Sequence, residues 1–258
     1  MKIEDKKYVI FLDIDGTLMG KSQEALERNF EVIGKVRSLG HKVLVNTGRS
    51  TAYLPAHIDF AKHFDGIVSG GGARIILDGK EIFCKVIEQD GIRKFCEVAF
   101  KQDTLCILEG IENIFHVGDD VEGHSDWIRI DEENMEDILK TSPRIEKFTT
   151  LGIVSEEFGK VLGEDYSVLQ HKGYAEILKK AYSKSGAVSY VMNYLDLPME
   201  QSIAMGDSLN DLDMINCAGI GVAMGNAIDV IKTAADMVTE DVNDSGVAVA
   251  LEKIFELR

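Results

Sequence analysis

The feature that most constrains the fold of this 258-residue chain is the alternation of short apolar segments with amphipathic ones. Residues 8–12 form an uninterrupted apolar run, and residues 22–39 follow with helical spacing, with Ser22 as the N-cap. Further apolar runs lie at 43–46 and 66–68. A short run without polar alternation is typical of a strand buried on both faces of a parallel sheet. Strand, helix and strand in this order predict right-handed βαβ units.

The same alternation returns in the last third of the chain. The expected helices and strands occupy 185–195, 202–205, 212–217, 220–223, 227–234 and 246–255. Both ends of the chain therefore predict one α/β fold, a Rossmann-like parallel sheet core flanked by helices.

The middle of the chain has a different pattern. Residues 75–83 form two short alternating runs joined by Asp78-Gly79, a strong hairpin signal. Beyond them a helical pattern at 87–100 alternates with short strands such as 105–108 and 145–151. We therefore predict an α/β core over 1–81 and 179–258, interrupted by an inserted α+β domain over 82–178.

Composition excludes several classes of protein. The 28 basic and 44 acidic side chains give a net charge of −16, which disfavours partners such as nucleic acid and anionic membranes. The sequence has neither 18 consecutive apolar residues nor the apolar core of a signal peptide, so we expect a soluble, cytoplasmic protein. Four cysteines without CxxC spacing indicate no zinc site and no disulfide framework. We take a monomer as the default, with a dimer as the alternative.

Two carboxylates follow the first predicted strand. Asp13 and Asp15 stand at positions i and i+2, and strand alternation predicts that they share a face. Ligands bind at the carboxyl ends of strands in open α/β sheets. An Asp-Gly turn is the plainer interpretation of these residues. A calcium loop is rejected, since Leu18 stands where that loop needs glycine and a strand precedes it.

A second acidic loop, residues 206–211, also follows an apolar strand and precedes a helix. Helix capping would use one carboxylate, whereas Asp207 and Asp211 flank Asn210 on both sides. Like charges brought together raise one another's pKa, so such a cluster favours a bound cation. Oxygen ligands with few carboxylates suit Mg²⁺. If the two loops meet, four carboxylates gather at one edge of the sheet: Asp13, Asp15, Asp207 and Asp211.

Two further segments are weak signals when taken alone. Asn46-Thr47-Gly48-Arg49 comes at the end of the second strand, where a hydroxyl and backbone N–H groups suit a phosphate, although a turn is the default interpretation. Lys184 precedes a helix, and an isolated lysine of this kind is usually solvated surface. Only their order along the chain makes these segments informative.

Together, the four segments resemble the haloacid dehalogenase (HAD) superfamily. The motifs, in order, are Asp13-x-Asp15-Gly16-Thr17, then Thr47-Gly48-Arg49, then Lys184, then Gly206-Asp207-x-x-Asn210-Asp211. The tail at 221–227, 235–236 and 246–248 is similar to the Cof-type phosphatase subfamily, which carries an α/β cap between the second and third motifs. One departure is Gly71, which stands where relatives carry asparagine, so a side-chain contact there is absent.

The resemblance implies a phosphatase that removes phosphate from a small phosphorylated metabolite, with sugar phosphates as the leading substrates. Asp13 would form an aspartyl-phosphate and Asp15 would act as general acid and base. Mg²⁺ would be the cofactor, bound by the Asp13 carboxylate, the Asp15 carbonyl and Asp207, with Asp211 orienting the metal shell. The residues implied in binding substrate are Thr47, Gly48, Arg49, Lys184 and Asn210.

Two other functions share these residues. A sugar phosphomutase would use the same core chemistry with a similar cap. A non-catalytic acidic binding protein would require the loss of a motif residue, and none is lost. The loop at 115–127 reads as a solvated acidic loop over Trp127, or as a loop that bonds a polyhydroxy substrate. The histidines have no metal-ligand spacing.

Overall fold

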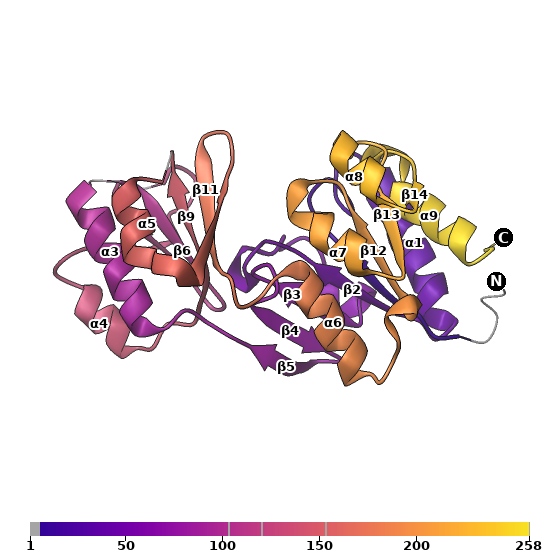
Figure 1. Ribbon diagram of the computed structural model, residues 1–258, viewed down its shortest axis with the longest axis horizontal. Coiled ribbons are helices and arrows are strands. Elements are labelled where there is room, and N and C mark those ends of the chain that lie inside the picture. Colours follow the sequence, from indigo (N-terminus) through magenta and orange to yellow (C-terminus); the bar gives the residue numbers. More distant parts are fainter. Residues whose placement is uncertain (1–5, 103, 120, 153, 258) are drawn as a thin grey trace. The chain divides into compact units, whose positions relative to one another are not determined.

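A computed structural model describes residues 6–102, 104–119, 121–152 and 154–257. Contacts divide the chain into two compact units, visible in Figure 1. The first unit comprises Met1–Gly48, Ala56–Phe83 and Ser183–Arg258, and the second comprises Arg49–Pro55 and Cys84–Tyr182. The segment 49–55 packs with the second unit, since the backbone N–H and the hydroxyl of Thr51 both donate to the carboxylate of Glu146. Sequence had placed that segment in the core.

The first unit is built on an eight-stranded sheet, parallel from β14 to β3, with β4 antiparallel to β3. This confirms the predicted α/β class. Only β14 escaped prediction, because two residues carry no periodicity. The strand order is β14 (Met237–Val238), β13 (Ile220–Ala223), β12 (Ser202–Gly206), β1 (Val9–Leu12), β2 (Lys42–Asn46), β3 (Gly66–Ser69), β4 (Arg74–Leu77), β5 (Lys80–Cys84).

Six helices accompany this sheet in the part of the chain that the structure describes. The Ser22 hydroxyl accepts a hydrogen bond from the backbone N–H of Ala25 (3.1 Å), so it caps the first helix as predicted. Four 3₁₀ turns, η1 (Thr51–Tyr53, second unit), η3 (Met199–Gln201), η4 (Leu209–Asp211) and η5 (Val242–Asp244), join other elements. The helices are α1 (Gln23–Ser38), α2 (Phe60–His63), α6 (Lys184–Tyr194), α7 (Leu212–Cys217), α8 (Asp229–Ala234) and α9 (Gly246–Ile254).

The core of the first unit fixes where the strands end. Phe11, Leu44 and Val68, from the three adjacent strands β1, β2 and β3, pack against α6 and α7 in one buried cluster. Asn29 links α1 to α9 by accepting from the backbone N–H of Ala248 (3.0 Å). The chain runs outward from β1 to β3 on one side and returns through β12 on the other. This reversal beside β1 is the topological switch point at which open α/β sheets bind ligands.

The described residues of the second unit form a six-stranded mixed sheet with three helices. All strand pairs whose register is described are antiparallel except β7 with β8. The expected elements at 87–100, 105–108 and 145–151 are present, with ends shifted by two residues or fewer. The strand order is β10 (Tyr166–Gln170), β11 (Tyr174–Lys179), β9 (Ile145–Leu151), β6 (Cys106–Gly110), β7 (Ile114–Val117), β8 (Ile128–Ile130); the helices are α3 (Gln89–Gln102), α4 (Met135–Lys140) and α5 (Glu156–Leu162), with a 3₁₀ turn η2 (Gly163–Asp165).

The core of the second unit is aromatic. The rings of Phe95 on α3 and Phe148 on β9 stack with centroids 3.9 Å apart, and Phe158 packs beside them at 5.3 Å. Lys147, next along β9, is also buried and pairs with Glu109 and Glu176. None of the described helices of either unit has the length and apolar character needed to span a membrane.

Replacing Phe95 by alanine should lower the free energy of unfolding of the second unit by about 3–5 kcal/mol, because it empties a fully buried ring position. The chain has one tryptophan, Trp127, which lies in the second unit, so its fluorescence during urea unfolding reports that unit. The matched control is Tyr174→Ala on β11, where the side chain is 38% exposed and the loss should stay below about 1 kcal/mol. Equal losses in both variants would contradict this description of the core.

Candidate functional site

The first motif forms a tight turn directly after β1. The strand ends at Leu12, and the backbone N–H groups of Leu18 and Met19 donate to the carbonyls of Asp13 and Ile14. The Asp13 side chain is buried, whereas Asp15 is exposed. The two carboxylates therefore do not share a strand face as expected, because the chain has already left the strand and turns at Gly16, which has φ of +81°.

Gly16 also brings the first and fourth motifs together. A Cβ atom at Gly16 would lie 2.4 Å from a carboxylate oxygen of Asp207, so only glycine leaves room for that side chain. The hydroxyl of Thr17 donates to Asp207 Oδ1 over 3.0 Å and is fully buried. The sequence indicates Thr17 only as part of the first motif. In the structure, its hydroxyl orients the carboxylate of Asp207.

Lys184 is the centre of the site. Its ammonium donates to Asp13 Oδ1 at 2.6 Å and to Asp211 Oδ1 at 2.5 Å, and the lysine is only 3% exposed. Burying a lone ammonium is costly unless carboxylates accompany it. Three segments thus converge on one buried ion triad, although Asp13 lies 171 residues from Lys184 and Asp211 lies 27 residues from it.

Asp211 is held from two sides. While Oδ1 accepts from Lys184, Oδ2 accepts the backbone N–H groups of Asp207 and Ser208, both at 3.0 Å. Gly206 permits this approach, since a Cβ atom there would lie 2.4 Å from the Cβ of Asp211. Both oxygens of Asp211 are therefore engaged, one by Lys184 and the other by the loop that presents Asp207.

Two of the carboxylates, Asp13 and Asp207, have a raised affinity for protons. Burial raises the pKa of Asp13 to about 8, with the charge of Asp211 adding to the shift and Lys184 opposing it. Burial and the charge of Asp211 likewise raise the pKa of Asp207 to about 6. Burial alone would lower the pKa of Lys184, but its two carboxylate partners raise that pKa above its usual range. Lys184 therefore stays positively charged, but its single charge does not balance the negative charge of the carboxylates around it.

This donor set fits a divalent cation. Asp13, Asp207 and Asp211 each offer an oxygen, and these oxygens lie within 4.8 Å of one another. One ammonium faces three carboxylates, which leaves a local excess of negative charge in a buried place. Oxygen ligands of this kind suit Mg²⁺ or Mn²⁺, and a cation would lower the raised pKa values of Asp13 and Asp207. The Asp15 carboxylate is not part of this group.

The second motif lies beside the fourth. Thr47 is buried, and its backbone N–H extends the sheet by donating to Val68 O at 3.0 Å. A Cβ atom at Gly48 would lie 3.6 Å from Asn210 Nδ2, so the Asn210 amide is a direct neighbour of Gly48. Arg49 instead packs with the second unit, where its guanidinium donates to Tyr53 O and lies 5.3 Å from the Tyr53 ring centroid.

The glycine run after β3 packs against two of the motifs. Gly71 donates its backbone N–H to Thr47 O at 3.0 Å, and a Cβ atom at Gly72 would lie 2.4 Å from Ser183 O. Gly71, which stands where relatives carry asparagine, therefore supports the second motif through its backbone N–H.

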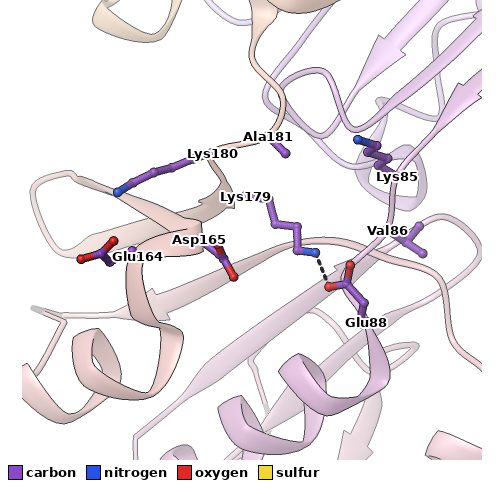
Figure 2. A pocket seen from close by; sticks show the side chains of 8 residues that line it. All are labelled: Lys85, Val86, Glu88, Glu164, Asp165, Lys179, Lys180 and Ala181. Atoms are coloured by element: carbon purple, nitrogen blue, oxygen red, sulfur yellow. Dashed lines mark hydrogen bonds and ion pairs between the residues drawn. The ribbon is translucent and has the colours of Figure 1, made fainter.

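Two further features belong to the second unit, whereas the three carboxylates belong to the first. In the loop at 115–127, where Asp120 lies outside the described residues, the Trp127 ring stacks on His124 at 4.0 Å. A hollow of about 600 Å³ carries an ion pair between Lys179 and Glu88 (Figure 2). Its lining residues are Lys85, Val86, Glu88, Glu164, Asp165, Lys179, Lys180 and Ala181.

Comparison with known proteins identifies a family of hydrolases and relatives that are phosphatases. A sequence profile of the haloacid dehalogenase-like hydrolases matches residues 10–251. The Bacillus subtilis 5-amino-6-(5-phospho-D-ribitylamino)uracil phosphatase YitU is 28% identical, over 99% of this chain and 100% of that protein. A second B. subtilis phosphatase of the same compound, YcsE, is 26% identical over 94% of each chain.

Solved structures agree with the fold. BT1666 from Bacteroides thetaiotaomicron, a phosphatase of the haloalkanoate (HAD) enzyme superfamily, is similar with a TM-score of 0.80 and 28% identity, covering 98% of this chain and 96% of that one. The HAD subclass IIB sugar phosphatase BT4131 has a similar fold, with a TM-score of 0.78 and 23% identity, covering 98% and 100%.

The raised pKa values predict that Mg²⁺ and protons compete for the site. Because Asp13 and Asp207 have pKa values of about 8 and about 6 without metal, the apparent Mg²⁺ affinity should rise about tenfold per pH unit between about pH 6 and 7.5. Titration calorimetry in two buffers of different ionisation enthalpy should also detect proton release. Glu24→Ala, an exposed acid in the first turn of α1, is the control that should bind like the wild type. An affinity independent of pH would contradict the pKa values.

Proposed function

The chain belongs to the haloacid dehalogenase-like hydrolases and is a phosphatase of that family, and on this basis we propose that it hydrolyses a sugar or sugar-alcohol phosphate with the help of Mg²⁺. The resemblance of the four sequence motifs to this family is confirmed. The observation that carries the proposal is the buried Lys184 ammonium, which holds Asp13 and Asp211 beside Asp207.

Asp13 is the nucleophile in this proposal. Its carboxylate attacks the phosphorus, the bond to the leaving alcohol breaks, and an aspartyl-phosphate forms. Lys184 bonds one oxygen of Asp13, which fixes the plane of the carboxylate and neutralises part of its charge. Without that charge, the approach of a phosphate dianion to a carboxylate would be strongly repulsive.

Asp207, the Asp13 carboxylate and the Asp15 backbone carbonyl would hold the cation. Bound there, Mg²⁺ supplies positive charge to the phosphoryl oxygens. Thr17 orients Asp207 through its hydroxyl, and Asp211 shapes the loop through two backbone N–H groups. With both its oxygens engaged, Asp211 suits an orienting role better than a direct bond to the metal.

Asp15 is the general acid and base in this proposal. It is exposed on the same turn as Asp13, which leaves its carboxyl group accessible to a leaving alcohol. It protonates that oxygen in the first step and takes a proton from the attacking water in the second. Thr47 and Gly48 would hold the phosphoryl oxygens, and Asn210 lies next to Gly48.

The substrate class rests on the relatives and on the second unit. YitU and YcsE act on a compound whose phosphate is carried by a ribityl chain, a sugar alcohol. We propose that the second unit is a cap that selects the substrate, with Arg49 as a further substrate contact. Phosphate release from a panel of sugar, sugar-alcohol, pyridoxal and flavin phosphates, with and without Mg²⁺, identifies the class. Isomerisation of a sugar phosphate by added bisphosphate, with little phosphate release, would instead support the phosphomutase.

Asp13→Asn should reduce kcat by at least about 10⁴-fold, because it removes the nucleophile while preserving the shape of the side chain. Acid quench of the wild type during turnover of ³²P-labelled substrate should trap label on Asp13, detectable by mass spectrometry of the tryptic peptide. Asp15→Asn should still form the labelled enzyme from a substrate with a good leaving group, since Asp15 acts on the alcohol. Appreciable Mg²⁺-dependent turnover by purified Asp13→Asn would overturn the nucleophile assignment.

A further inference from the structure

The peptide group that joins Lys184 to Ser185 is held on both of its polar sides. Its carbonyl, that of Lys184, accepts from the side-chain amide of Asn46 at 3.1 Å. Its N–H, that of Ser185, donates to Asp213 Oδ2 at 3.1 Å. These two side chains come from β2 and α7, and neither belongs to the four motifs.

Asp213 has several bonds at this place. Its Oδ2 also accepts from the Ser185 hydroxyl at 2.7 Å, while Oδ1 accepts from the backbone N–H of Met214 at 2.8 Å. The carboxylate thus joins the first turn of α7 to the first turn of α6, where a negative charge is favourable. Ser183 is the N-cap of α6, and its hydroxyl accepts from the Gly186 N–H at 3.1 Å. Asp213 is therefore an addition to ordinary helix capping.

Asn46 approaches the same peptide from the sheet. It is completely buried at the last position of β2, directly before Thr47. Its amide nitrogen also lies 3.5 Å from Met214 Sδ. An asparagine in a buried strand costs free energy unless its polar atoms are bonded. Here the amide nitrogen bonds Lys184 O, whereas Oδ1 is buried without a hydrogen-bond partner among the described residues, so the bond to Lys184 O is the one that this asparagine contributes.

We propose that Asn46 and Asp213 are positioning residues for the proposed phosphoryl transfer: together they clamp the Lys184–Ser185 peptide and thereby aim the Lys184 ammonium. Neither touches substrate in this account; both act through Lys184. The inference rests on the proposed function, because the role it refines is that of Lys184 in that reaction.

The physical reason is the length of the lysine side chain. Four rotatable bonds separate its backbone from its ammonium, so a small rotation of the peptide displaces the charge at the far end. The ammonium must meet Asp13 and Asp211 within hydrogen-bond distance at the same time. A displacement of about 1 Å in such a site can cost up to about a hundredfold in rate.

Asn46→Ala and Asp213→Ala should each lower kcat by about 5- to 50-fold and change KM by less than about threefold, since the substrate contacts themselves are retained. Asp213→Asn should restore most of kcat, because its amide oxygen can still accept from Ser185. Glu24→Ala, an exposed acid in the first turn of another helix, is the matched control and should match the wild type.

A second readout does not need activity. Lys184 is 3% exposed and should acetylate slowly with an N-hydroxysuccinimide ester, whereas Lys94 has a half-exposed side chain and serves as internal standard. In Asn46→Ala and Asp213→Ala, the labelling of Lys184 relative to Lys94 should rise at least about fivefold by mass spectrometry, because the freed ammonium leaves its carboxylates more often. If Asp213→Ala does not fold, Ser185→Ala is used in its place, because it removes the hydrogen bond from the Ser185 hydroxyl to Asp213.

The outcomes separate the two proposals. A wild type without Mg²⁺-dependent phosphatase activity would overturn the proposed function, and the labelling would still test the clamp. Unchanged kcat and unchanged labelling in both variants would overturn the clamp. A lowered kcat that Asp213→Asn fails to restore would also overturn it, because charge rather than geometry would then be responsible.

Discussion

The structure of the site depends on one buried ammonium between two carboxylates. Lys184 is nearly inaccessible to water, so the free energy of burying it must be offset by Asp13 and Asp211. These residues come from the turn after β1, from the start of α6 and from η4 after β12. The turn and η4 meet because β1 and β12 are neighbours in a parallel sheet. The parallel order places both strand ends at one edge, where Asp207 and Thr17 complete the group.

The acidic residues of the chain fall into two groups, those at the site and those elsewhere. Three of its 44 acidic residues form the oxygen cluster, and burial and the charge of Asp211 raise the pKa values of Asp13 and Asp207. A net charge of −16 disfavours an anionic phosphate at long range, so attraction must come from groups at the site. Lys184 alone offsets one charge, and the remaining excess favours a divalent cation. Cytoplasmic location and monomeric state stay predictions.

Sequence predicted most strands and helices of the first unit, because buried strands and amphipathic helices leave strong periodic patterns, but it did not predict the short elements α2 and β14. It also predicted the motif residues, since their order along the chain is informative even where each is weak alone. It placed 49–55 wrongly with the core, since the bonds from Thr51 to Glu146 join residues 95 positions apart. It included Asn46 in the second candidate segment without giving it a role of its own, and it missed Asp213, because a bond to a backbone peptide leaves no residue pattern. Strand alternation also failed for Asp15, since the chain turns directly after Leu12.

The most direct measurement is a crystal structure of the full chain grown with Mg²⁺ and beryllium fluoride, which forms a stable mimic of a phosphorylated carboxylate. The account predicts beryllium fluoride on the carboxylate of Asp13, with the Lys184 ammonium and the Thr47 hydroxyl on its fluorines and the cation on Asp207. The Asn210 side chain should remain beside Gly48. An adduct on Asp15, or a cation bound away from Asp207, would contradict it.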